Sequence, residues 1–455
     1  MDPALLARFE IRRVPRYTSY PTAPHFTAAV DADMYEQWLG QITPDQDVSL
    51  YLHVPYCRTL CLYCGCHTRA TARQKPVDAY AAALLREVAM LTARLPRRMR
   101  LAQVHWGGGT PTILAPRDLL GVMDVLRAHF RFDAETEVAI EADPRRLPDE
   151  TLAALGRGGF NRASIGVQSF DPAVQAAIGR IQSFEETARA AAALRRHGAR
   201  GISVDLIYGL PHETVASATE TADRVVALAP DRVAVFGYAH VPWMKRHQRL
   251  IDETTLPDGP ARLAQFAVIA GRLLSAGYRR VGLDHFARPG DRLARAADDG
   301  TLHRNFQGYT TDAAPVLIGL GASAIGSLPA GYVQNLAAVP DYLKAIGEGR
   351  LPVARGRALT PDDRLRRDVI EQLMCHGRVD LTCTAQRHWT TPAALGDAQP
   401  ALERLVREGV AQVDGPVVRV ADEARPLVRC VAAAFDAYLA DPDAATGTAR
   451  HARAV

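Results

Sequence analysis

The segment YLHVPYCRTLCLYCGC (residues 51–66) joins a strand-like run to a loop that holds four of the seven cysteines in the chain. Its first residues include β-branched and aromatic side chains, which are typical of a strand. Cys57, Cys61 and Cys64 follow in C-x3-C-x2-C spacing, and Cys66 comes two residues later. Thiolates this close together on one loop can bind a single soft metal centre, either zinc or an iron–sulfur cluster.

The number of thiolates distinguishes these two centres. Zinc normally takes a fourth ligand from a second cysteine pair or a histidine pair, and the chain contains no matching pair elsewhere. Three cysteines on a cluster of four irons leave one iron without a protein ligand, and that iron can bind a substrate. The spacing therefore favours a cluster that performs chemistry, with a zinc knuckle or unligated thiols as the alternative.

Strand-like and helical segments alternate along the chain around and beyond this loop. Short β-branched runs occur at residues 49–54, 102–106, 137–142, 162–167, 202–208, 232–238 and 279–286. Segments of helical period occur at residues 77–94, 117–129, 149–157, 184–197, 214–228 and 260–276. This alternation predicts βαβ units in a parallel sheet, and their number favours an α/β barrel over a small doubly wound sheet. Ligands of such folds bind at the carboxyl ends of the strands.

Two regions without the alternating strand and helix pattern flank the predicted barrel. We predict that residues 1–45 form an N-terminal arm, which contains the aromatic and proline-rich stretch PRYTSYPTAPHF, and that residues 46–356 form the barrel. We expect residues 357–455 to form a mainly helical C-terminal domain, in which two amphipathic helices precede a strand–turn–strand around Asp414-Gly415-Pro416. Helices followed by a small hairpin resemble a winged-helix module.

Composition restricts the function classes. The chain has 455 residues, 48% hydrophobic and 23% charged, and no apolar run approaches the ~18–20 residues needed to cross a bilayer. The first residues lack the apolar core of a secretion signal. The basic residues are scattered and form no stripe. We therefore expect a cytoplasmic protein with no membrane insertion and no nucleic-acid partner.

The remaining cysteines and several histidines point to packing, not to ligation. An odd number of cysteines argues against a disulfide framework. We expect Cys375, Cys383 and Cys430 to be buried as small hydrophobic residues. The histidines of the predicted barrel are interpreted as hydrogen-bonded polar residues: His53, His105, His240, His285 and His303.

The cysteine loop after the first strand of a repeated βα unit resembles the loop of the radical S-adenosylmethionine (SAM) enzymes. The aromatic Tyr63 immediately before the third cysteine fits the same pattern. The resemblance implies a three-quarter, open α/β barrel and a [4Fe–4S] cluster bound by Cys57, Cys61 and Cys64. It also implies that SAM binds the open iron and is cleaved to a 5′-deoxyadenosyl radical.

A closer resemblance, to the oxygen-independent coproporphyrinogen III oxidases, extends from about residue 15 to about residue 440. It rests on these segments: PRYTSYPTA (15–23), the cysteine loop (51–66), HWGGGTPT (105–112), IEADPR (140–145), NRASIGVQSF (161–170), VDLIYGLP (204–211), YAHVP (238–242), DHFARP (284–289) and HRNFQGYTT (303–311). Cys66, in C-x-C spacing with Cys64, belongs to this subgroup and not to radical SAM enzymes in general.

Site residues follow partly from position and partly from the resemblance. Glu141, Gln168 and Asp205 are polar residues within or at the end of predicted strands, where ligands of α/β folds bind. Gly107–Thr110 would close the second strand around a ligand. The resemblance implies that one SAM molecule contacts Tyr51, Gly108, Glu141 and Ile325. It implies that a second contacts Tyr63, Gly109, Thr110, Gln168, Arg180, Asp205 and Ala239. Cys66 and Tyr17 are candidate catalytic residues, and the Arg16–Tyr17 part of the arm is expected over the active site.

The implied activity is the oxidative decarboxylation of two propionate side chains of coproporphyrinogen III to vinyl groups in haem biosynthesis. An external reductant, an external electron acceptor and a monomeric enzyme belong to this expectation. One alternative is a haem-trafficking relative, which typically lacks the fourth cysteine and carries an H-N-x-x-Y-W motif; this chain has Cys66 and lacks that motif. Another alternative is a different porphyrin-directed radical SAM enzyme, such as a methyltransferase or a haem-degrading relative.

Overall fold

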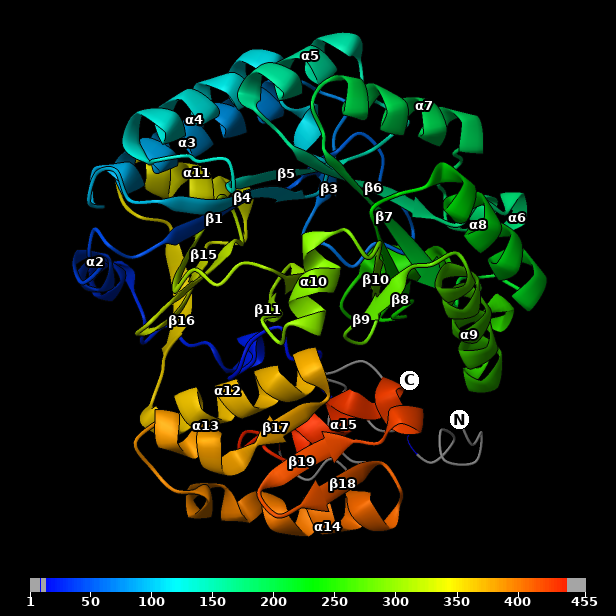
Figure 1. The fold of residues 1–455 in the computed structure, drawn as a ribbon. Coiled ribbons are helices and arrows are strands. Elements are labelled where there is room, and N and C mark those ends of the chain that lie inside the picture. The colour runs from blue at the N-terminus through cyan, green and yellow to red at the C-terminus, as the bar shows by residue number, and fades with distance from the viewer. Residues whose placement is uncertain (1–8, 10–13, 440–455) are drawn as a thin grey trace.

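A curved, open sheet of twelve strands dominates the structure, a computed structural model that describes Phe9 and residues 14–439 (Figure 1). In spatial order the strands are β16 (Val353–Ala358), β15 (Gly331–Asn335), β14 (Ile325–Leu328), β13 (Val316–Leu320), β1 (Val48–Val54), β4 (Leu101–Gly108), β5 (Glu137–Ala142), β6 (Arg162–Gln168), β7 (Gly201–Tyr208), β8 (Arg232–Gly237), β10 (His285–Ala287) and β9 (Arg279–Val281). Strands from β13 to β8 pair in parallel, and the pairs at both edges are antiparallel. The predicted open α/β barrel is confirmed.

Helices cover the outer face of this sheet (Figure 1). The crossover helices are α3 (Lys75–Thr92), α4 (Pro116–His129), α5 (Asp149–Gly158), α7 (Phe184–Arg196), α8 (Val215–Leu228) and α9 (Gly259–Ser275). Each lies within two residues of its predicted range. Ser183, Thr214 and Asp258 start three of them, because the side-chain oxygen of each accepts a hydrogen bond from a backbone N–H of the first turn. Among the described residues, no helix is long and apolar enough to cross a membrane.

The remaining short elements of the arm and barrel lie before β1 or in the connections between these strands and helices. They are η1 (Ala23–His25), α2 (Ala32–Gly40), β2 (Tyr56–Cys57), β3 (Arg69–Ala70), η2 (Pro111–Ile113), α6 (Pro172–Ala177), η3 (Arg246–Leu250), η4 (Glu253–Thr255), α10 (Arg292–Asp298), β11 (His303–Asn305), β12 (Gly308–Thr310) and α11 (Val339–Gly347). Two of them, β2 and β3, pair within the cysteine loop, and β11 and β12 form a hairpin.

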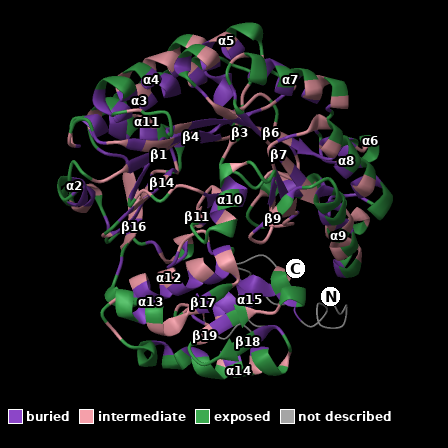
Figure 2. Ribbon diagram, viewed as in Figure 1, coloured by how far each residue is buried: buried purple, intermediate pink, exposed green. Residues whose placement is uncertain are grey.

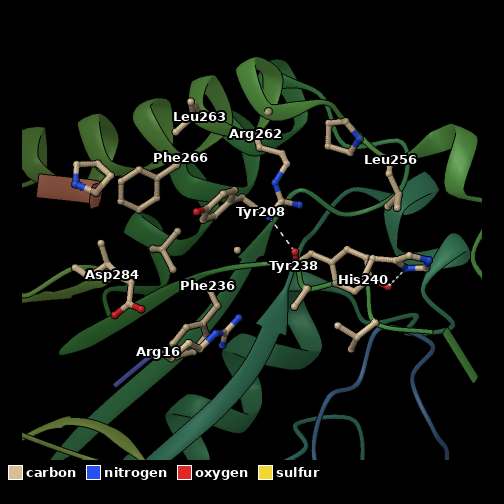
Figure 3. A pocket seen from close by; sticks show the side chains of 18 of the residues that line it. Arg16, Tyr208, Phe236, Tyr238, His240, Leu256, Arg262, Leu263, Phe266 and Asp284 are labelled. Carbon is tan, nitrogen blue, oxygen red and sulfur yellow. Dashed lines mark hydrogen bonds between the residues drawn. The ribbon is translucent and has the colours of Figure 1, made fainter. Parts of the chain in front are cut away.

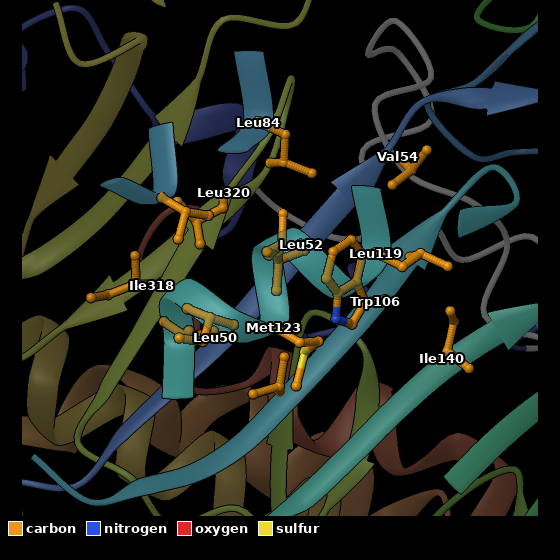
Figure 4. Close-up of a cluster of buried hydrophobic side chains, with 14 of the residues drawn as sticks. Leu50, Leu52, Val54, Leu84, Trp106, Leu119, Met123, Ile140, Ile318 and Leu320 are labelled. Atoms are coloured by element: carbon orange, nitrogen blue, oxygen red, sulfur yellow. The ribbon is translucent and has the colours of Figure 1, made fainter. Parts of the chain in front are cut away.

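Alternate side chains of the barrel strands face the hydrophobic core and the inside of the barrel. Side chains on the outer face of the strands pack against the helices (Figure 4): Leu50, Leu52, Val54, Trp106, Ile140, Ile318 and Leu320 meet Leu84, Leu119 and Met123. Successive side chains of a strand point to opposite faces, so Tyr51 and His53 of β1 face the inside of the barrel. Figure 2 shows the strands and the inner sides of the helices buried, with the outer sides of the helices exposed.

An ion-pair network closes the amino-terminal end of the barrel. Arg162 Nε donates to Glu137 Oε2 at 3.0 Å, and Arg162 and Arg232 both bond to Asp291 just before α10. Glu137, Arg162 and Arg232 are the first residues of β5, β6 and β8. The predicted site residues lie at the opposite end, the carboxyl end of the strands, where ligands of such folds bind.

Two predictions about strands need correction. The run at 279–286 is not one parallel strand; it forms β9 and β10, which pair antiparallel to each other around Gly282, whose φ is +58°. The buried strand β13 (Val316–Leu320) pairs with β1 at the centre of the sheet and was absent from the predicted strands. It is continuously buried and leads into an antiparallel hairpin, so no crossover helix follows it.

The C-terminal region has its own core below the open side of the barrel (Figure 1). Its elements are α12 (Pro361–His376), β17 (Arg378–Asp380), α13 (Leu381–Arg387), η5 (Pro392–Ala398), α14 (Gln399–Arg407), β18 (Ala411–Asp414), β19 (Val417–Val420), η6 (Asp422–Leu427) and α15 (Val428–Ala433). Tyr17 and Tyr20 of the arm are buried in this core. Residues 1–8, 10–13 and 440–455, at the ends of the predicted arm and C-terminal domain, lie outside the described residues.

Candidate active site

The cysteine loop is fixed by the segment that follows β8. Gln248 Nε2 donates to the carbonyl of Tyr63 at 2.9 Å, and Lys245 Nζ donates to the carbonyl of Cys66 at 2.8 Å. His247 Nε2 lies 2.8 Å from the carbonyl of Cys64. These contacts hold the backbone around the third and fourth cysteines, so the loop is ordered by the protein itself.

Hydrogen-bond donors surround the predicted cluster thiols. Thr110 donates to Cys57 Sγ at 3.4 Å, and Thr68 Oγ1 lies 3.3 Å from the same sulfur. Arg180 Nη1 and Arg145 Nη2 approach Cys61 Sγ at 3.7 Å and 4.0 Å. A hydrogen bond from Cys66 lowers the pKa of Cys64 to about 7. Such donors favour thiolates over thiols.

This arrangement fits an iron–sulfur cluster better than a mononuclear ion. Among the described residues, no group of three His, Cys, Asp or Glu side chains is placed to hold one metal ion. A four-iron cluster spaces its thiolates more widely than one ion, because each thiolate binds a different iron. Cys57, Cys61 and Cys64 present soft sulfur donors on one loop with charge-assisted hydrogen bonds, and this donor set suits a [4Fe–4S] cluster.

Beside the loop, Tyr51, Glu141 and the glycine strand come together as predicted. Glu141 Oε2 accepts a hydrogen bond from the backbone N–H of Gly108 at 3.0 Å. A side chain at Gly107 would collide with this carboxylate, because a Cβ there would lie 2.7 Å from Glu141 Oε1 and 3.0 Å from Tyr51. His105, stacked on Tyr51 with ring centroids 5.8 Å apart, places Nε2 3.4 Å from Glu141 Oε1.

Ile325 reaches the same place from the other side of β1. Tyr51 pairs with Gly319 of β13, and a Cβ on Gly319 would lie only 2.6 Å from the backbone of Ile325. The chain therefore folds back over this strand pair at a point where no side chain fits. Ile325 thus begins β14, on the far side of β13 from Tyr51.

A second group of predicted residues meets across β6, β7 and the end of β8. Arg180 Nη2 donates to the carbonyl of Gly166 at 2.6 Å, and Gly166 pairs with Asp205. Gln168 is buried at the end of β6 with a φ of +69°, a conformation that costs energy for a side chain other than glycine. Gln248 connects the carbonyls of Tyr63 and Ala239.

Asp205 has an unusual electrostatic position among these residues. Burial, and then the negative charge of Glu141, raise the pKa of Asp205 to about 6. Ser164 donates to its Oδ2 at 3.3 Å, and this bond and the nearby His285 and His105 act to lower the pKa of Asp205. A buried carboxyl with a raised pKa beside another carboxylate suits a cationic ligand.

Three residues beside the cysteine loop were missed or given little weight in the sequence analysis. Arg180 could not be distinguished from the many exposed arginines, yet it is buried and reaches Cys61. Asp143 binds Arg145 at 2.6 Å and lies 3.6 Å from Arg180, so it connects both arginines that face that cysteine. The motif IEADPR contains Asp143 and Arg145 and was the signal for them.

The interpretation of the five histidines is confirmed, and one of the cysteines is corrected. Each histidine has a hydrogen-bond partner: His53 with Tyr51 and the carbonyl of His67, His105 with Glu141, His240 with Tyr238 and Glu253, His285 with Asp284, and His303 with Glu371. Cys375 and Cys430 are buried as expected. Cys383 is exposed, whereas Thr384 and Ala385 of the same helix, α13, are buried.

Comparison with known proteins agrees with this geometry. Residues 51–225 match the model of the radical SAM superfamily. The chain is 52% identical to the oxygen-independent coproporphyrinogen III oxidase of Bradyrhizobium diazoefficiens over 455 residues, with both chains covered completely. The Pseudomonas aeruginosa protein of the same name is 39% identical, with 96% of each chain covered. The chain belongs to the oxygen-independent coproporphyrinogen III oxidases.

A solved member of these oxidases shares the whole architecture. The coproporphyrinogen III oxidase of Escherichia coli, described as a radical SAM enzyme, superimposes with a TM-score of 0.90 at 38% identity. The match covers 96% of this chain and 99% of that chain. The radical SAM barrel with its helical C-terminal region is therefore confirmed, and membership implies SAM and a [4Fe–4S] cluster.

Within this oxidase, the two candidate catalytic residues lie in different surroundings. Cys66 is exposed at the end of the cysteine loop, next to the thiols that the family implies as ligands. Tyr17 is buried in the C-terminal core, where its hydroxyl donates to Asp436 Oδ2 at 3.0 Å. Its partners belong to the C-terminal domain, and the described contacts of Tyr17 do not include the cysteine loop. A catalytic role for Tyr17 stays a prediction.

A large cavity adjoins the site of this oxidase (Figure 3). It has a volume of about 630 Å³ and lies at the ends of β7 and β8, beside α9. Ala239, whose carbonyl is bonded to Gln248, lies on its wall, so the cavity reaches the second group of predicted SAM residues. Arg16 of the arm also lines it, whereas Tyr17 does not. Tyr17, Thr18 and Ser19 of the arm line a different, smaller cavity of about 190 Å³ together with His303 and Arg304.

Proposed function

We propose that this chain catalyses the anaerobic oxidative decarboxylation of two propionate side chains of coproporphyrinogen III to vinyl groups, giving protoporphyrinogen IX. The observation that carries the proposal is that the three-cysteine loop lies beside the Glu141–Gly108 hydrogen bond, with Thr110 bonded to Cys57. The chain also matches an oxidase over its whole length. Haem biosynthesis is the process that consumes this product.

Cys57, Cys61 and Cys64 are proposed to hold the [4Fe–4S] cluster, and Cys66 remains free. When bound, the cluster and SAM supply a 5′-deoxyadenosyl radical that removes a hydrogen atom from the substrate. Arg180 and Arg145 stabilise the Cys61 thiolate through charge-assisted hydrogen bonds. Asp143 keeps both guanidinium groups in place.

Tyr51, Gly108, Glu141 and Ile325 are proposed to bind the SAM on the cluster. The backbone N–H of Gly108 fixes the carboxylate of Glu141, and its remaining lone pairs can accept from a cationic ligand. His105 holds the same carboxylate from the other side. A fixed carboxylate orients a bound ammonium or sulfonium group without reorganisation.

A second SAM molecule is proposed to bind Tyr63, Gly109, Thr110, Gln168, Arg180, Asp205 and Ala239. The proposal is supported by contacts that involve four of these residues: Arg180 to Gly166, Gly166 to Asp205 through the strand register, and Gln248 to Tyr63 and Ala239. Asp205 supplies negative charge once it loses its proton.

Each propionate loses a hydrogen atom, carbon dioxide and one electron. A β-hydrogen leaves as an atom, the carboxylate then leaves as carbon dioxide, and one electron passes to an external acceptor, which leaves a vinyl group. The protein orients the propionate toward the site and excludes water from it. An external reductant supplies the electron that SAM cleavage requires. We propose that the enzyme is a monomer and that it acts in the cytoplasm.

A haem-trafficking role is the second candidate, because such relatives share the three cysteines. Cys66 and the arm that lines the cavity favour the enzyme. Anaerobic incubation of the reconstituted protein with SAM, a strong reductant and coproporphyrinogen III distinguishes the two. We expect vinyl products with release of carbon dioxide and 5′-deoxyadenosine. Tight haem binding without vinyl products would support the trafficking role instead.

A further inference from the structure

The cavity beside the site has an unusual concentration of arginines. Four guanidinium groups line it, and they come from three parts of the chain: the arm, the barrel and the C-terminal domain. They are Arg16, Arg262, Arg304 and Arg429. Arg16 and Arg262 come from opposite walls in Figure 3. The arginine-lined cavity therefore lies where the arm, the barrel and the C-terminal domain meet.

Three of these arginines lie close together. Arg304 Nη2 donates to the carbonyl of Arg16 at 3.3 Å, and Arg429 Nη1 donates to the carbonyl of Val14 at 3.5 Å. Burial, followed by the positive charge of Arg16, lowers the pKa of Arg429. Bringing like charges together in a partly buried site is unfavourable unless an anion compensates them.

The carboxylates on the cavity wall have hydrogen-bond partners other than the four arginines. Glu253 bonds to His240 at 2.9 Å, and Asp258 accepts the N–H of Ala261 at the start of α9. Asp284 bonds to His285 at 2.7 Å. Burial raises the pKa of Asp284, but the His285 bond and the charges of His285, Arg304 and Arg16 outweigh it and lower the pKa to about 2. Asp284 is therefore ionised and leaves a net positive charge among the four arginines.

Arg304 has unused hydrogen-bonding capacity. Among the described residues, its Nε and Nη1 atoms are buried without a hydrogen-bond partner. Its guanidinium stacks on the ring of Tyr309, with Cζ 4.4 Å from the ring centroid, so its position is fixed. A guanidinium that is held in place and has unpaired donors suits a carboxylate oxygen as acceptor.

The remaining walls are apolar and aromatic. Tyr208, Phe236 and Phe266 line the middle of the cavity, and Trp243 lies at its edge with 52% of its surface exposed. A ligand that fits has an apolar, ring-shaped body and acidic groups on its rim. Such a body buries aromatic surface while the acidic groups meet the arginines.

We propose that Arg16, Arg304 and Arg429 bind propionate carboxylates of the porphyrinogen and so orient the macrocycle, with Arg262 on the opposite wall. This inference rests on the proposed function and adds to it the residues that recognise the substrate. The propionates held by arginine are stabilised as anions, so they suit the side chains that are kept while another propionate extends past Ala239 to the SAM site. These arginines are positioning residues.

The test uses the reconstituted, anaerobic holoenzyme with Arg304→Gln and Arg16→Gln, both of which lie outside the apolar core. Binding of coproporphyrinogen III and of its methyl ester is measured without reductant, and KM and kcat are measured with it. We expect each variant to lose about tenfold or more in affinity for the free acid and to leave the affinity for the uncharged ester unchanged. KM should rise with kcat changed much less, and Arg304→Lys should restore part of the affinity.

Arg272→Gln is the matched control, since Arg272 lies on α9 like Arg262 but is exposed and pairs with Asp223. Iron content and SAM cleavage without substrate should be the same in all variants. Equal affinity of wild type, Arg304→Gln and Arg16→Gln for the free acid would overturn the inference while the enzyme still forms vinyl groups. A wild-type protein that neither binds coproporphyrinogen III nor forms vinyl groups would overturn the proposed function, and this inference with it.

Discussion

Arg180 Nη1 lies 3.7 Å from Cys61 Sγ, and the same guanidinium donates through Nη2 to the carbonyl of Gly166 at 2.6 Å. One buried side chain therefore joins strand β6 to the cysteine loop. Asp143 lies 3.6 Å from this guanidinium and compensates part of its charge. The contact connects the environment of the proposed cluster with the strand that carries Gln168, so changes at Arg180 should affect both.

Replacing Arg180 with Gln should make the cluster harder to reduce. Hydrogen bonds and positive charge near a cluster thiolate favour the reduced, more negative state, so their loss lowers the reduction potential. We expect the midpoint potential to fall by about 60 mV, which is about a tenfold change for one electron. Potentiometric titration followed by electron paramagnetic resonance measures it. Arg146→Gln, an exposed neighbour of Arg145, is the control, and an unchanged potential in Arg180→Gln would contradict the assignment.

The cysteines should divide into three ligands and one free thiol. Reconstituted protein should contain about four irons and four sulfides. Cys57→Ser, Cys61→Ser and Cys64→Ser should each lose the cluster and SAM cleavage, whereas Cys66→Ser should retain the cluster. Cys383→Ser, at an exposed position in the C-terminal domain, controls for loss of a thiol as such. Full SAM cleavage by any of the three ligand variants would show that the cluster lies elsewhere.

Asp205 should make SAM binding depend on pH. Burial and Glu141 raise the pKa of Asp205 to about 6, so the free protein holds this carboxyl protonated below that value. If the ionised form binds cationic SAM, affinity at the second site should rise about tenfold from pH 5 to pH 7, with proton release on binding. Isothermal titration in buffers of different ionisation enthalpy measures both quantities. Asp205→Asn should remove the dependence and leave the cluster spectrum unchanged; a pH-independent wild type would exclude Asp205 from the site.

The order of strands and helices could be predicted because periodicity is local. The crossover helices are amphipathic and begin at capping residues such as Thr214, so their positions follow from short windows of sequence. Strand β13 (Val316–Leu320) could not be found in this way, because a continuously buried strand has no alternation. Its place beside β1 depends on the closing of the sheet, which is a property of the whole chain.

The same distinction holds at the site. The cysteine loop could be identified from its spacing alone, because few functions need three thiols in eight residues. Arg180 looks like any other arginine in the sequence, and only the fold reveals that it is buried against Cys61. Likewise, Arg16 and Arg429 are separated by nearly the whole chain but line one cavity. Long-range electrostatic relationships of this kind are set by tertiary structure.

Glu87 should impose a pH dependence on stability. Its buried carboxylate accepts hydrogen bonds from the Gly321 N–H, Asn335 and Tyr342, each at 2.7 Å, and so ties α3 to the turn that leads to Ile325. Burial raises the pKa of Glu87 from 4.5 to about 7. Between these values the folded state retains a proton that the unfolded state has released, so the free energy of unfolding falls as pH rises.

The size of this effect can be isolated with Glu87→Gln, which removes the titrating group. The stability difference between variant and wild type should shift in favour of the variant by up to about 3 kcal/mol from pH 4.5 to pH 7.5. Urea unfolding at several pH values measures it. Glu36→Gln, an exposed carboxylate paired with Arg94, is the control and should show no such trend. A constant difference between Glu87→Gln and wild type would mean that Glu87 is ionised throughout.

The arm should stabilise the C-terminal domain as well as line the cavity. Tyr20 is buried, and its hydroxyl accepts the N–H of Ala437 at 3.0 Å. The backbone N–H of Tyr20 donates to the hydroxyl of Tyr332 in β15, and that hydroxyl donates to the carbonyl of Tyr20. The arm therefore connects the barrel to the C-terminal core. Deleting residues 1–26 would remove Arg16 and this connection together, and loss of activity would then have two causes.

Single substitutions separate these two roles. Tyr20→Ala should cost about 3–5 kcal/mol, because it removes a large buried ring, and Tyr17→Phe about 1 kcal/mol, because it removes the hydroxyl that donates to Asp436. Arg16→Gln should change the free energy of unfolding by less than about 0.5 kcal/mol, because its side chain is exposed. Urea unfolding followed by tryptophan fluorescence measures all three. If Tyr20→Ala is as stable as wild type, the arm does not support the C-terminal core, and deletion of residues 1–26 then becomes a direct test of its role over the active site.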